Sequence, residues 1–558
     1  MCAPKILYIQ KETALNKISI AICAVLCSLA AVSCGNSDRG DGMGHMYDAA
    51  LCGNPSSLDP QYASDQASAT VIKNMYSGLL RADDSGNISC CNAASYTVSP
   101  DGLTYTFRLR KDNYWFRDAD HDDIIAEGEY FPVKADDYVF AFQRLLDPKM
   151  QSPYAPYYSC IKNGEKIIEG SLPAEAAGVR AADDYTLEIT LDHPSANFLT
   201  MLAASPASPC NKEFFESTKG TYGLSDSSVM SNGAFYMRQW FYDPYGSHNI
   251  LYMRRCDINV NDNTQVIPTF LSFSVERDED DVWQCLKDGD AECMTTLNRS
   301  HASRKYSVTS KSSVTLGLIF EQKNSCFRSE ALRKALALSI DRKKLADSIS
   351  DDITVAYGII PPAAQLSGRS YRELYSDRSF AGYDPDGAAK LFEEAKKELK
   401  TGRFDNIKIM VCANTVDSST LHILSQQWQD TLGIYIGIED VSEEDFRRRL
   451  KDGDFEVALY PLDGDVNTPL STIAQFETKK ELAAASGGKK YLSELMRCGS
   501  VAETVEELSA AEREILGYYG FVPVFYKNSY LIMDKDNEDI FYDPFTGAVD
   551  YRLAKNYS

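Results

Sequence analysis

Strand patterns and helix patterns alternate along most of this 558-residue chain, and this alternation is the strongest constraint on its fold. Residues 103–110 and 185–192 alternate apolar with polar side chains, which predicts two strands with one buried face each. Apolar residues at helical spacing recur in three later segments, 136–146, 384–399 and 419–432. Short apolar runs at 407–412 and 434–438 predict two more strands. We therefore expect an α/β protein with partly parallel sheets.

Helix-capping and helix-breaking residues predict where the helices begin and end. Asp136 is the predicted N-cap of the first helix, and Asp147-Pro148 ends it. Asp384 followed by proline begins the second helix, since proline fits the first helical position. Gly433 ends the third helix.

The first 33 residues have the composition of an export signal. Three lysines precede an apolar run at 18–32, which is shorter than the roughly 20 residues of a spanning helix. Cys34 follows a small residue and resembles the lipidated cysteine of a bacterial lipoprotein. Ala31 stands where that pattern prefers leucine, so an ordinary secretory signal or an uncleaved anchor is the alternative. Residues 34–44 predict a flexible tether.

The rest of the chain is acidic. The net charge is −23, and it is about −25 from Cys34 onward because the leader carries three lysines and one glutamate. Nucleic acid is not an expected partner, since phosphate binding needs a basic surface. We expect a folded part that is soluble outside the cell and held at a membrane surface by its lipidated end.

Signatures of catalysis and of metal binding are scarce. The six histidines show no ligand spacing, and nucleophile elbows, Walker loops and Cys-x-x-Cys pairs are absent. Of the 15 cysteines, the 11 that follow Cys34 are thinly spread, which predicts free thiols, with one or two disulfides as the alternative. We expect no enzyme, cofactor or metal. A hydrolase would need a serine or cysteine beside a histidine such as His193 or His248.

One acidic loop has partial calcium-site spacing. Asp118, Asp120, Asp122 and Glu129 fall at positions 1, 3, 5 and 12 of an EF-hand-like loop. Asp123 stands where the loop needs glycine, and no helix pattern follows. A solvated loop is the favoured interpretation, with calcium binding left open.

Several short motifs occur in a fixed order along the chain. They include Leu58-Asp-Pro60, residues 74–80, 101–110, 133–140 and 144–148, Ser152-Pro-Tyr-Ala155, Ser231-Asn-Gly-Ala-Phe235, residues 332–342 and Val522-Pro-Val-Phe-Tyr526. This ordered set resembles the oligopeptide and dipeptide family of solute-binding proteins, which feed ABC importers. The similarity spans nearly all of residues 50 to 550.

The resemblance implies a two-lobed fold like that of periplasmic binding proteins, with a hinged cleft and an additional small α+β domain. Lobe closure about the hinge is the family's working motion. The implied division gives lobe I residues 45–78, 186–300 and 516–558, the extra domain 79–185, and lobe II 301–515.

The resemblance also implies a function. The protein would be a monomeric lipoprotein that captures extracellular oligopeptides in the cleft and delivers them to the permease and ATPase subunits of an importer. It would lie on the extracellular face of the cell membrane, or on the periplasmic side where there are two membranes. The alternatives are the same fold with a non-peptide solute, and a surface lipoprotein with a sensing or adhesive role.

A bound peptide needs a partner for its α-ammonium group, because an unpaired buried charge is costly. In the family an aspartate of an Asp-x-Asn-x-Pro segment takes that role. Counting without gaps from Val457 places it on Asp465, with Asn467 and Pro469 completing the segment. Asp463 is the alternative if the local alignment shifts by two.

Two further cleft residues follow from the resemblance. Tyr154 corresponds to a tyrosine whose hydroxyl hydrogen-bonds the ligand's first residue, and Gln66 lies in a segment that offers strand-like backbone. The chain also departs from the family. Pro461-Leu462 replaces a Gly-Trp pair, and Leu459 stands where some members carry an arginine for the ligand's carboxylate. Ligand length and carboxylate pairing are therefore left open.

Overall fold

The structure is a computed structural model. It describes residues 46–557 except for short gaps at 84, 120–121, 123–125, 247–248, 260–264, 324, 350, 377–381, 402–403, 405 and 414. The predicted signal, the tether, Cys34 and Asp120 thus lie outside the described residues. Within the described ranges, no helix is both long enough and apolar enough to cross a membrane.

Lobe I is built on a four-stranded sheet. Its strands, in spatial order, are β1 (Met46–Cys52), β12 (Phe270–Glu276), β11 (Ile250–Arg255) and β10 (Phe235–Phe241). β1 pairs with β12 in parallel, and the other two pairs are antiparallel. Helix α2 (Gln66–Met75) begins at Asp65, whose carboxylate caps the backbone N–H of Ser68.

The small domain contains the two strands that the alternating patterns predict. Its antiparallel sheet has the order β4 (Ala93–Val98), β5 (Thr104–Leu109), β9 (Thr186–Thr190) and β8 (Val179–Asp183). Phe107 and Leu187 face each other across β5 and β9 and are fully buried, as the period of two predicts. β9 pairs only within this sheet, so the boundary predicted at residue 186 is wrong and belongs after Leu191.

A seven-stranded mixed sheet forms the core of lobe II. Its strands are β13 (Cys293–Thr296), β21 (Phe521–Met533), β14 (Ser307–Phe320), β20 (Val457–Leu462), β18 (Lys408–Cys412) and β19 (Gly437–Val441), with β15 (Ile353–Val355) beside β21. Two of these strands, β13 and β21, come from the segments assigned to lobe I. β18 is parallel to β19 and to β20. The expected combination of helices with a partly parallel sheet is confirmed.

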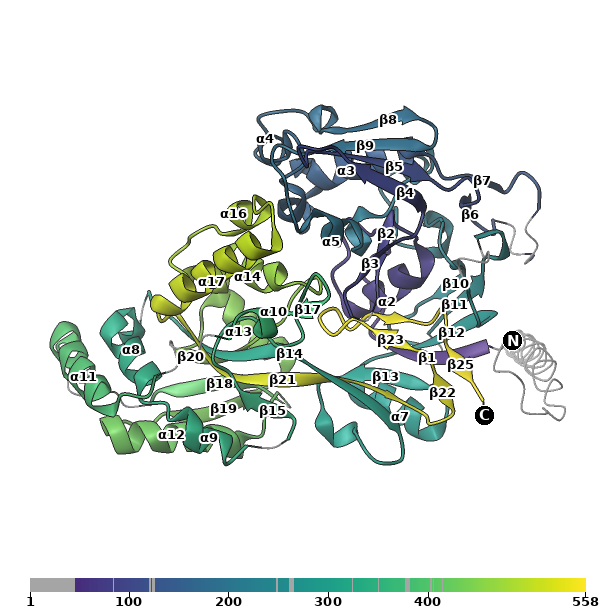
Figure 1. Ribbon diagram of the computed structural model, residues 1–558. Helices are drawn as coiled ribbons and strands as arrows, with labels where there is room; N and C mark the ends of the chain where they lie inside the picture. The colour runs from purple at the N-terminus through teal and green to yellow at the C-terminus, as the bar shows by residue number, and fades with distance from the viewer. Residues whose placement is uncertain are drawn as a thin grey trace, which may run out of the picture.

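Helices cover both faces of the lobe II sheet (Figure 1). One face carries α8 (Glu330–Leu338), α11 (Pro385–Leu399) and α12 (Ser418–Leu432), and the other carries α14 (Pro469–Thr478), α16 (Leu492–Met496) and α17 (Val501–Gly517). Along β20, Leu459 packs into the core under α8, α11 and α12, whereas Ala458 packs toward α14 and α17. Position 459 therefore faces a helical core, and the carboxylate-binding role that the family gives this position is not available here.

Two long strands connect the lobes. β14 and β21 pair antiparallel along most of their length, and β21 continues to pair with β13 below lobe I (Figure 1). These strands are the crossing segments between the two halves. With the boundary after Leu191 corrected, the division into two lobes and a small domain stands as our proposal.

The helix ends follow the predictions with one correction. α3 (Ala135–Leu146) has Lys134 rather than Asp136 at its N-cap, because the carboxylate of Asp137 accepts a hydrogen bond from the Lys134 N–H at 2.9 Å. Asp384 caps α11 and Gly433 ends α12 with a φ of 72°, both as predicted. Strand β19 begins at Gly437 rather than Ile434, although Ile434 and Ile436 are buried.

Further strands and α-helices complete the described part of the chain. The strands are β2 (Leu80–Ala82), β3 (Ile88–Cys90), β6 (Tyr114–Phe116), β7 (Tyr130–Pro132), β16 (Gln365–Leu366), β17 (Arg369–Ser370), β22 (Asn537–Glu538), β23 (Phe541–Tyr542), β24 (Val549–Asp550) and β25 (Lys555–Asn556). The helices are α4 (Gly164–Ile168), α5 (Phe198–Leu202), α6 (Lys212–Ser217), α7 (Glu279–Asp288), α9 (Arg342–Ala346), α10 (Tyr371–Leu374), α13 (Glu443–Asp452) and α15 (Lys480–Ala485).

Candidate functional site

The loop between β20 and α14 carries the predicted ammonium partner. Gly464 lies in this loop, where a Cβ atom would come within 2.3 Å of Ser471 Oγ and 2.6 Å of the Phe545 ring. No side chain fits there, so glycine lets the loop press against both α14 and the C-terminal segment of lobe I. This close packing fixes the positions of the two aspartates on either side.

Asp465 reaches from lobe II to the small domain. Its Oδ2 accepts a hydrogen bond from the hydroxyl of Tyr157 at 3.3 Å, and Tyr157 lies in a short helical turn, Ala155–Tyr158. Burial raises the pKa of the Asp465 carboxyl, and the positive charge of Lys479 offsets part of that rise. In the described part of the chain, Asp465 has no ion-pair partner.

Asp463 lies beside it and also lacks an ion pair among the residues that the structure describes. The amide of Gln475 donates to its Oδ1 at 3.1 Å and to its carbonyl at 3.0 Å. The side chain is open to water, yet the surrounding protein raises its pKa, and the nearby charge of Asp465 raises it further. Two carboxylates thus share a partly desolvated region with no cation bound to either, which favours a positively charged ligand.

Tyr154, the second predicted cleft residue, lies in the small domain and already makes one hydrogen bond. It is buried, and its hydroxyl donates to the carbonyl of Ala63 at 2.7 Å. With its proton committed there, the hydroxyl can only accept a hydrogen bond, as it would from an ammonium group. The charge of Asp465 helps to raise the pKa of this tyrosine, after burial, so the two groups are neighbours. The sequence reasoning missed Tyr157, whose only signal is its place in a tyrosine-rich stretch.

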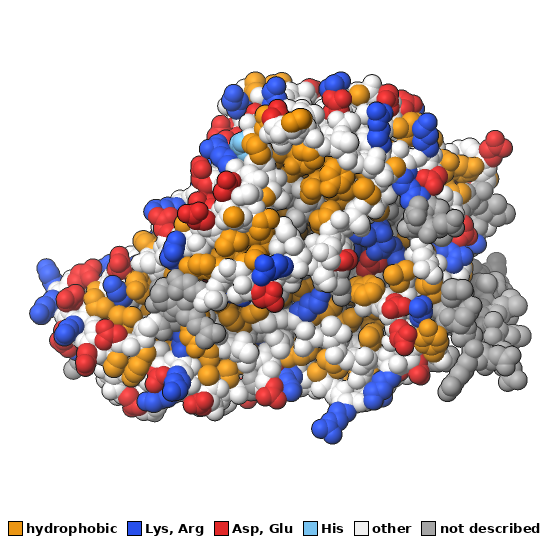
Figure 2. Space-filling model, in the orientation of Figure 1, with side chains coloured by type: hydrophobic (Ala, Val, Ile, Leu, Met, Phe, Trp, Pro, Cys, Tyr) orange, Lys and Arg blue, Asp and Glu red, His pale blue; other side chains and the backbone are white. Residues whose placement is uncertain are grey.

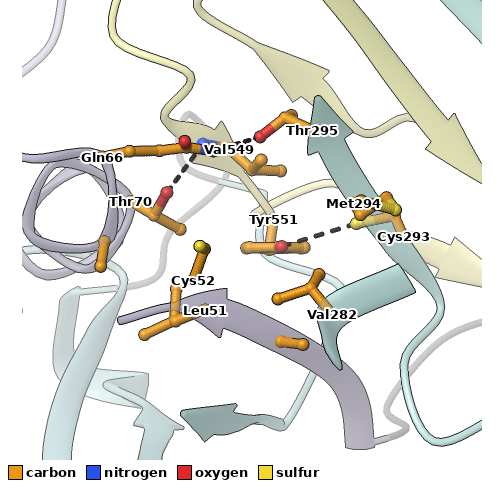
Figure 3. A pocket seen from close by; sticks show the side chains of 12 residues that line it. Leu51, Cys52, Gln66, Thr70, Val282, Cys293, Met294, Thr295, Val549 and Tyr551 are labelled. Carbon is orange, nitrogen blue, oxygen red and sulfur yellow. Dashed lines mark hydrogen bonds between the residues drawn. The ribbon is translucent and has the colours of Figure 1, made fainter. Parts of the chain in front are cut away.

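Gln66 begins α2 and hydrogen-bonds the hydroxyl of Thr295 on β13 (Figure 3). It lines a cavity of about 20 Å³ together with Cys293 and Tyr551, whose thiol and hydroxyl lie 3.5 Å apart. That volume fits about one water molecule. The cavity is therefore no peptide site, and Gln66 mainly ties α2 to β13.

Asn467 lies two residues after Asp465. Its Oδ1 is buried and has no hydrogen-bond partner within the described residues. The side chain lines a second, larger cavity of about 430 Å³. Asn467 and Gln66 thus line different cavities. Asp463, Tyr154 and Tyr157 instead lie around Asp465.

The prediction of a solvated loop at residues 118–129 is wrong for its first residue, Asp118. Asp118 is 3% exposed, and its Oδ2 lies 3.5 Å from Nε of Arg238. The carboxylate of Glu129 accepts the N–H of Ala126 in its own turn. In the described ranges no group of three or more histidine, cysteine or acidic side chains is arranged to hold a metal.

Cysteines and histidines offer no reactive pair in the part of the chain that the structure describes. All eleven cysteines there are free thiols. No serine or cysteine hydrogen-bonds His193, and His301 instead stacks on Trp283 with ring centroids 4.5 Å apart. Charged side chains of both signs are scattered over the face in Figure 2, without an extended basic surface.

Known proteins share this architecture. Residues 91–483 match the family described as bacterial extracellular solute-binding proteins, family 5 Middle. The oligopeptide-binding protein OppA of Bacillus subtilis is 23% identical over 521 residues, which cover 90% of either chain. The periplasmic oligopeptide-binding protein OppA of Salmonella typhimurium is 26% identical over 495 residues, which cover 84% of this chain and 85% of the relative.

A solved structure shows the same fold. OppA of Listeria monocytogenes, bound to peptide, superposes with a TM-score of 0.70 at 20% identity and covers 92% of this chain and 99% of its own. The expected two-lobed α/β fold is thereby confirmed. Since the family match extends over well more than half of the residues, the chain belongs to family 5 of the bacterial extracellular solute-binding proteins.

Proposed function

We propose that this protein is the substrate-binding component of an ABC importer, and that it captures extracellular oligopeptides between its lobes. The observation that carries the proposal is Asp465, a partly buried carboxylate between lobe II and the small domain that makes no ion pair with any described residue. Relatives named as oligopeptide-binding proteins support the choice of ligand.

The peptide's α-ammonium group supplies the missing positive charge. A charge-assisted hydrogen bond between the ammonium group and Asp465 offsets the free-energy cost of removing both charges from water. Without a partner, that cost would be uncompensated for either group. We assign to the Tyr154 hydroxyl, which can only accept, a second ammonium proton of the peptide. Asp463 adds negative potential at the same place. Capture and release of the peptide need no covalent step in this arrangement.

Delivery to a permease and its ATPase subunits requires the protein to stay at the membrane. Residues 1–33 as an export signal, Cys34 as the lipidated residue and residues 34–44 as the tether would hold it on the extracellular face as a monomer. The family is an extracellular one, which supports this location.

Peptide affinity is expected to fall as the solution is acidified. The raised pKa of Asp465 means that it takes up a proton at a higher pH than an ordinary aspartate, whose pKa is about 3.9. A neutral carboxyl cannot pair with the ammonium, so binding below the raised pKa must first release a proton. Calorimetry at neutral pH and near pH 5 checks this, with the Asp465→Asn variant as the control that should lose the dependence.

The function itself is tested with pooled tripeptides to hexapeptides that carry free N-termini. We expect the pool to raise the melting temperature, because a ligand that binds only the folded state stabilises it. Calorimetry with fractions of the pool then gives affinities. A melting temperature that no pool shifts would leave the non-peptide solute or the sensing role as the better account.

A further inference from the structure

The larger cavity is lined by strand β14, the β16–β17 hairpin with its flanking residues, the turn between β2 and β3, and Asn467. We call it the hairpin pocket. It is lined by Ser85, Lys311, Ser312, Pro362, Ala363, Gln365, Gly368, Arg369, Ser370, Glu373 and Asn467. Its volume of about 430 Å³ falls in the range of small-molecule sites, roughly 300–1,000 Å³.

One wall of the hairpin pocket forms where the small domain touches lobe II. The turn between β2 and β3 meets the hairpin of β16 and β17. A Cβ atom on Gly86 would lie 3.1 Å from Gln365 Cβ, and one on Gly368 would lie 2.7 Å from Asn87 Oδ1. Both glycines also have positive φ, 78° and 75°. The two turns thus pack closely at their glycines, and Ser85 of the β2–β3 turn belongs to the lining only while they touch.

Two polar atoms in the lining are buried and unpaired within the described residues. They are the Oγ of Ser312 and the Oδ1 of Asn467. Buried polar atoms without a partner are uncommon, because each one costs free energy. Ser312 lies where the pairing of β14 with β21 shifts register, and such bulges re-aim side chains. Both atoms therefore point to a ligand with polar groups of its own.

The charges in the lining are mostly positive, in a protein whose net charge is −23. Lys311 and Arg369 face one acid, Glu373. Arg369 makes no ion pair with any residue that the structure describes. A guanidinium group offers a fork of donors that matches a carboxylate. The lining therefore suits an anionic group.

The hairpin that carries Arg369 is held firmly. The hydroxyl of Ser370 donates to the carbonyl of Pro362 at 2.7 Å. Arg372, in the helix that follows, donates to the carbonyl of Ile360 at 2.7 Å and pairs with the buried Glu512. A site on such a fixed backbone is already organised before the ligand arrives.

We propose that the hairpin pocket binds a carboxylate of the captured peptide, with Arg369 as its ion-pair partner. Ser312 donates a hydroxyl hydrogen bond to the carboxylate, and Asn467 Oδ1 accepts a backbone N–H of the peptide. The inference rests on the proposed function, since Asn467 follows Asp465 by two residues and both would serve one short peptide. The carboxylate comes either from the C-terminus or from an aspartate or glutamate side chain.

Four tripeptide pools with free N-termini test this. The first pair contains neutral residues and differs only in a free or amidated C-terminus. Both members of the second pair have an amidated C-terminus. One member contains aspartate and glutamate, and the other contains asparagine and glutamine in their place. We expect the wild type to bind the carboxylate member of at least one pair about tenfold or more tightly. A preference within the first pair assigns the C-terminus, and one within the second assigns the side chain.

Arg369→Gln should abolish that preference, whereas Arg304→Gln, an exposed arginine of the same lobe, should keep it. The pocket proposal is overturned if neither pair shows a preference in the wild type, or if the preference survives Arg369→Gln. All four pools keep the ammonium group. Binding without preference therefore counts against the pocket alone, while no binding by any pool counts against the proposed function.

Discussion

Asp465→Asn is expected to lower the affinity for peptides with a free N-terminus by about 100-fold at neutral pH. Removing one partner of a buried charge pair costs about 2–5 kcal/mol, because the other charge is left without compensation. Asparagine keeps the shape and the hydrogen bond from Tyr157 but not the charge. Calorimetry with a free tripeptide pool measures the loss.

The same substitution is expected to stabilise the ligand-free protein slightly at neutral pH. The raised pKa means that folded Asp465 holds its proton more strongly than in the unfolded chain. Its contribution to stability is therefore present at low pH and lost as the pH rises through the raised pKa. Asparagine carries no such penalty, so urea unfolding should show a small gain.

Two other aspartates serve as controls. Asp463→Asn should weaken binding less than Asp465→Asn, because its carboxylate is more open to water. Asp440→Asn, exposed on β19, should leave binding unchanged. A larger loss for Asp463→Asn would transfer the ammonium role to Asp463.

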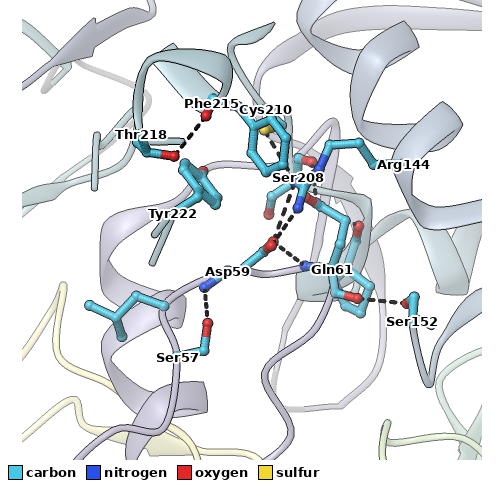
Figure 4. Close-up of polar contacts among 12 residues, drawn as sticks. Ser57, Asp59, Gln61, Arg144, Ser152, Ser208, Cys210, Phe215, Thr218 and Tyr222 are labelled. Atoms are coloured by element: carbon cyan, nitrogen blue, oxygen red, sulfur yellow. Dashed lines mark hydrogen bonds and ion pairs between the residues drawn. The ribbon is translucent and has the colours of Figure 1, made fainter. Parts of the chain in front are cut away.

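Asp59→Ala is expected to lower the free energy of unfolding by about 3–5 kcal/mol, because it leaves the buried charge of Arg144 unpaired. The two side chains form an ion pair in which they are 9% and 4% exposed. Arg144 also donates to Gln61 Oε1 at 2.7 Å and lies 4.0 Å from the Phe215 ring centre (Figure 4).

This ion pair joins lobe I, which carries Asp59, to α3 of the small domain. Urea unfolding measures the loss. Asp257→Ala is the matched control, since its pair with Arg255 is exposed and should matter little. A decrease for Asp59→Ala no larger than that of the control would show that packing, not the ion pair, joins these two parts.

Much of the fold could be predicted where one face of an element is buried and the other is not. β5 and β9 showed their period of two for that reason. Gly433 could be predicted to end a helix because glycine readily adopts the positive φ that it has there. The pairing of β14 with β21 could not be predicted, because both run through the core over much of their length and the pairing joins segments about 200 residues apart.

The site was only partly predictable. Asp465 and Asn467 follow from a local motif, so their numbers could be read from the chain. Tyr157 could not, since its role depends on a contact with a residue 308 positions away. The same is true of Arg369, which becomes notable only when the fold brings it into one cavity with Asn467.

The central claim is that Asp465 neutralises the ammonium group of a bound peptide. Its most direct test compares one tripeptide pool with its N-acetylated form, in the wild type and in Asp465→Asn, as a double-mutant cycle. We predict that acetylation weakens binding strongly in the wild type and only slightly in the variant. An equal effect of acetylation on both proteins would contradict the claim.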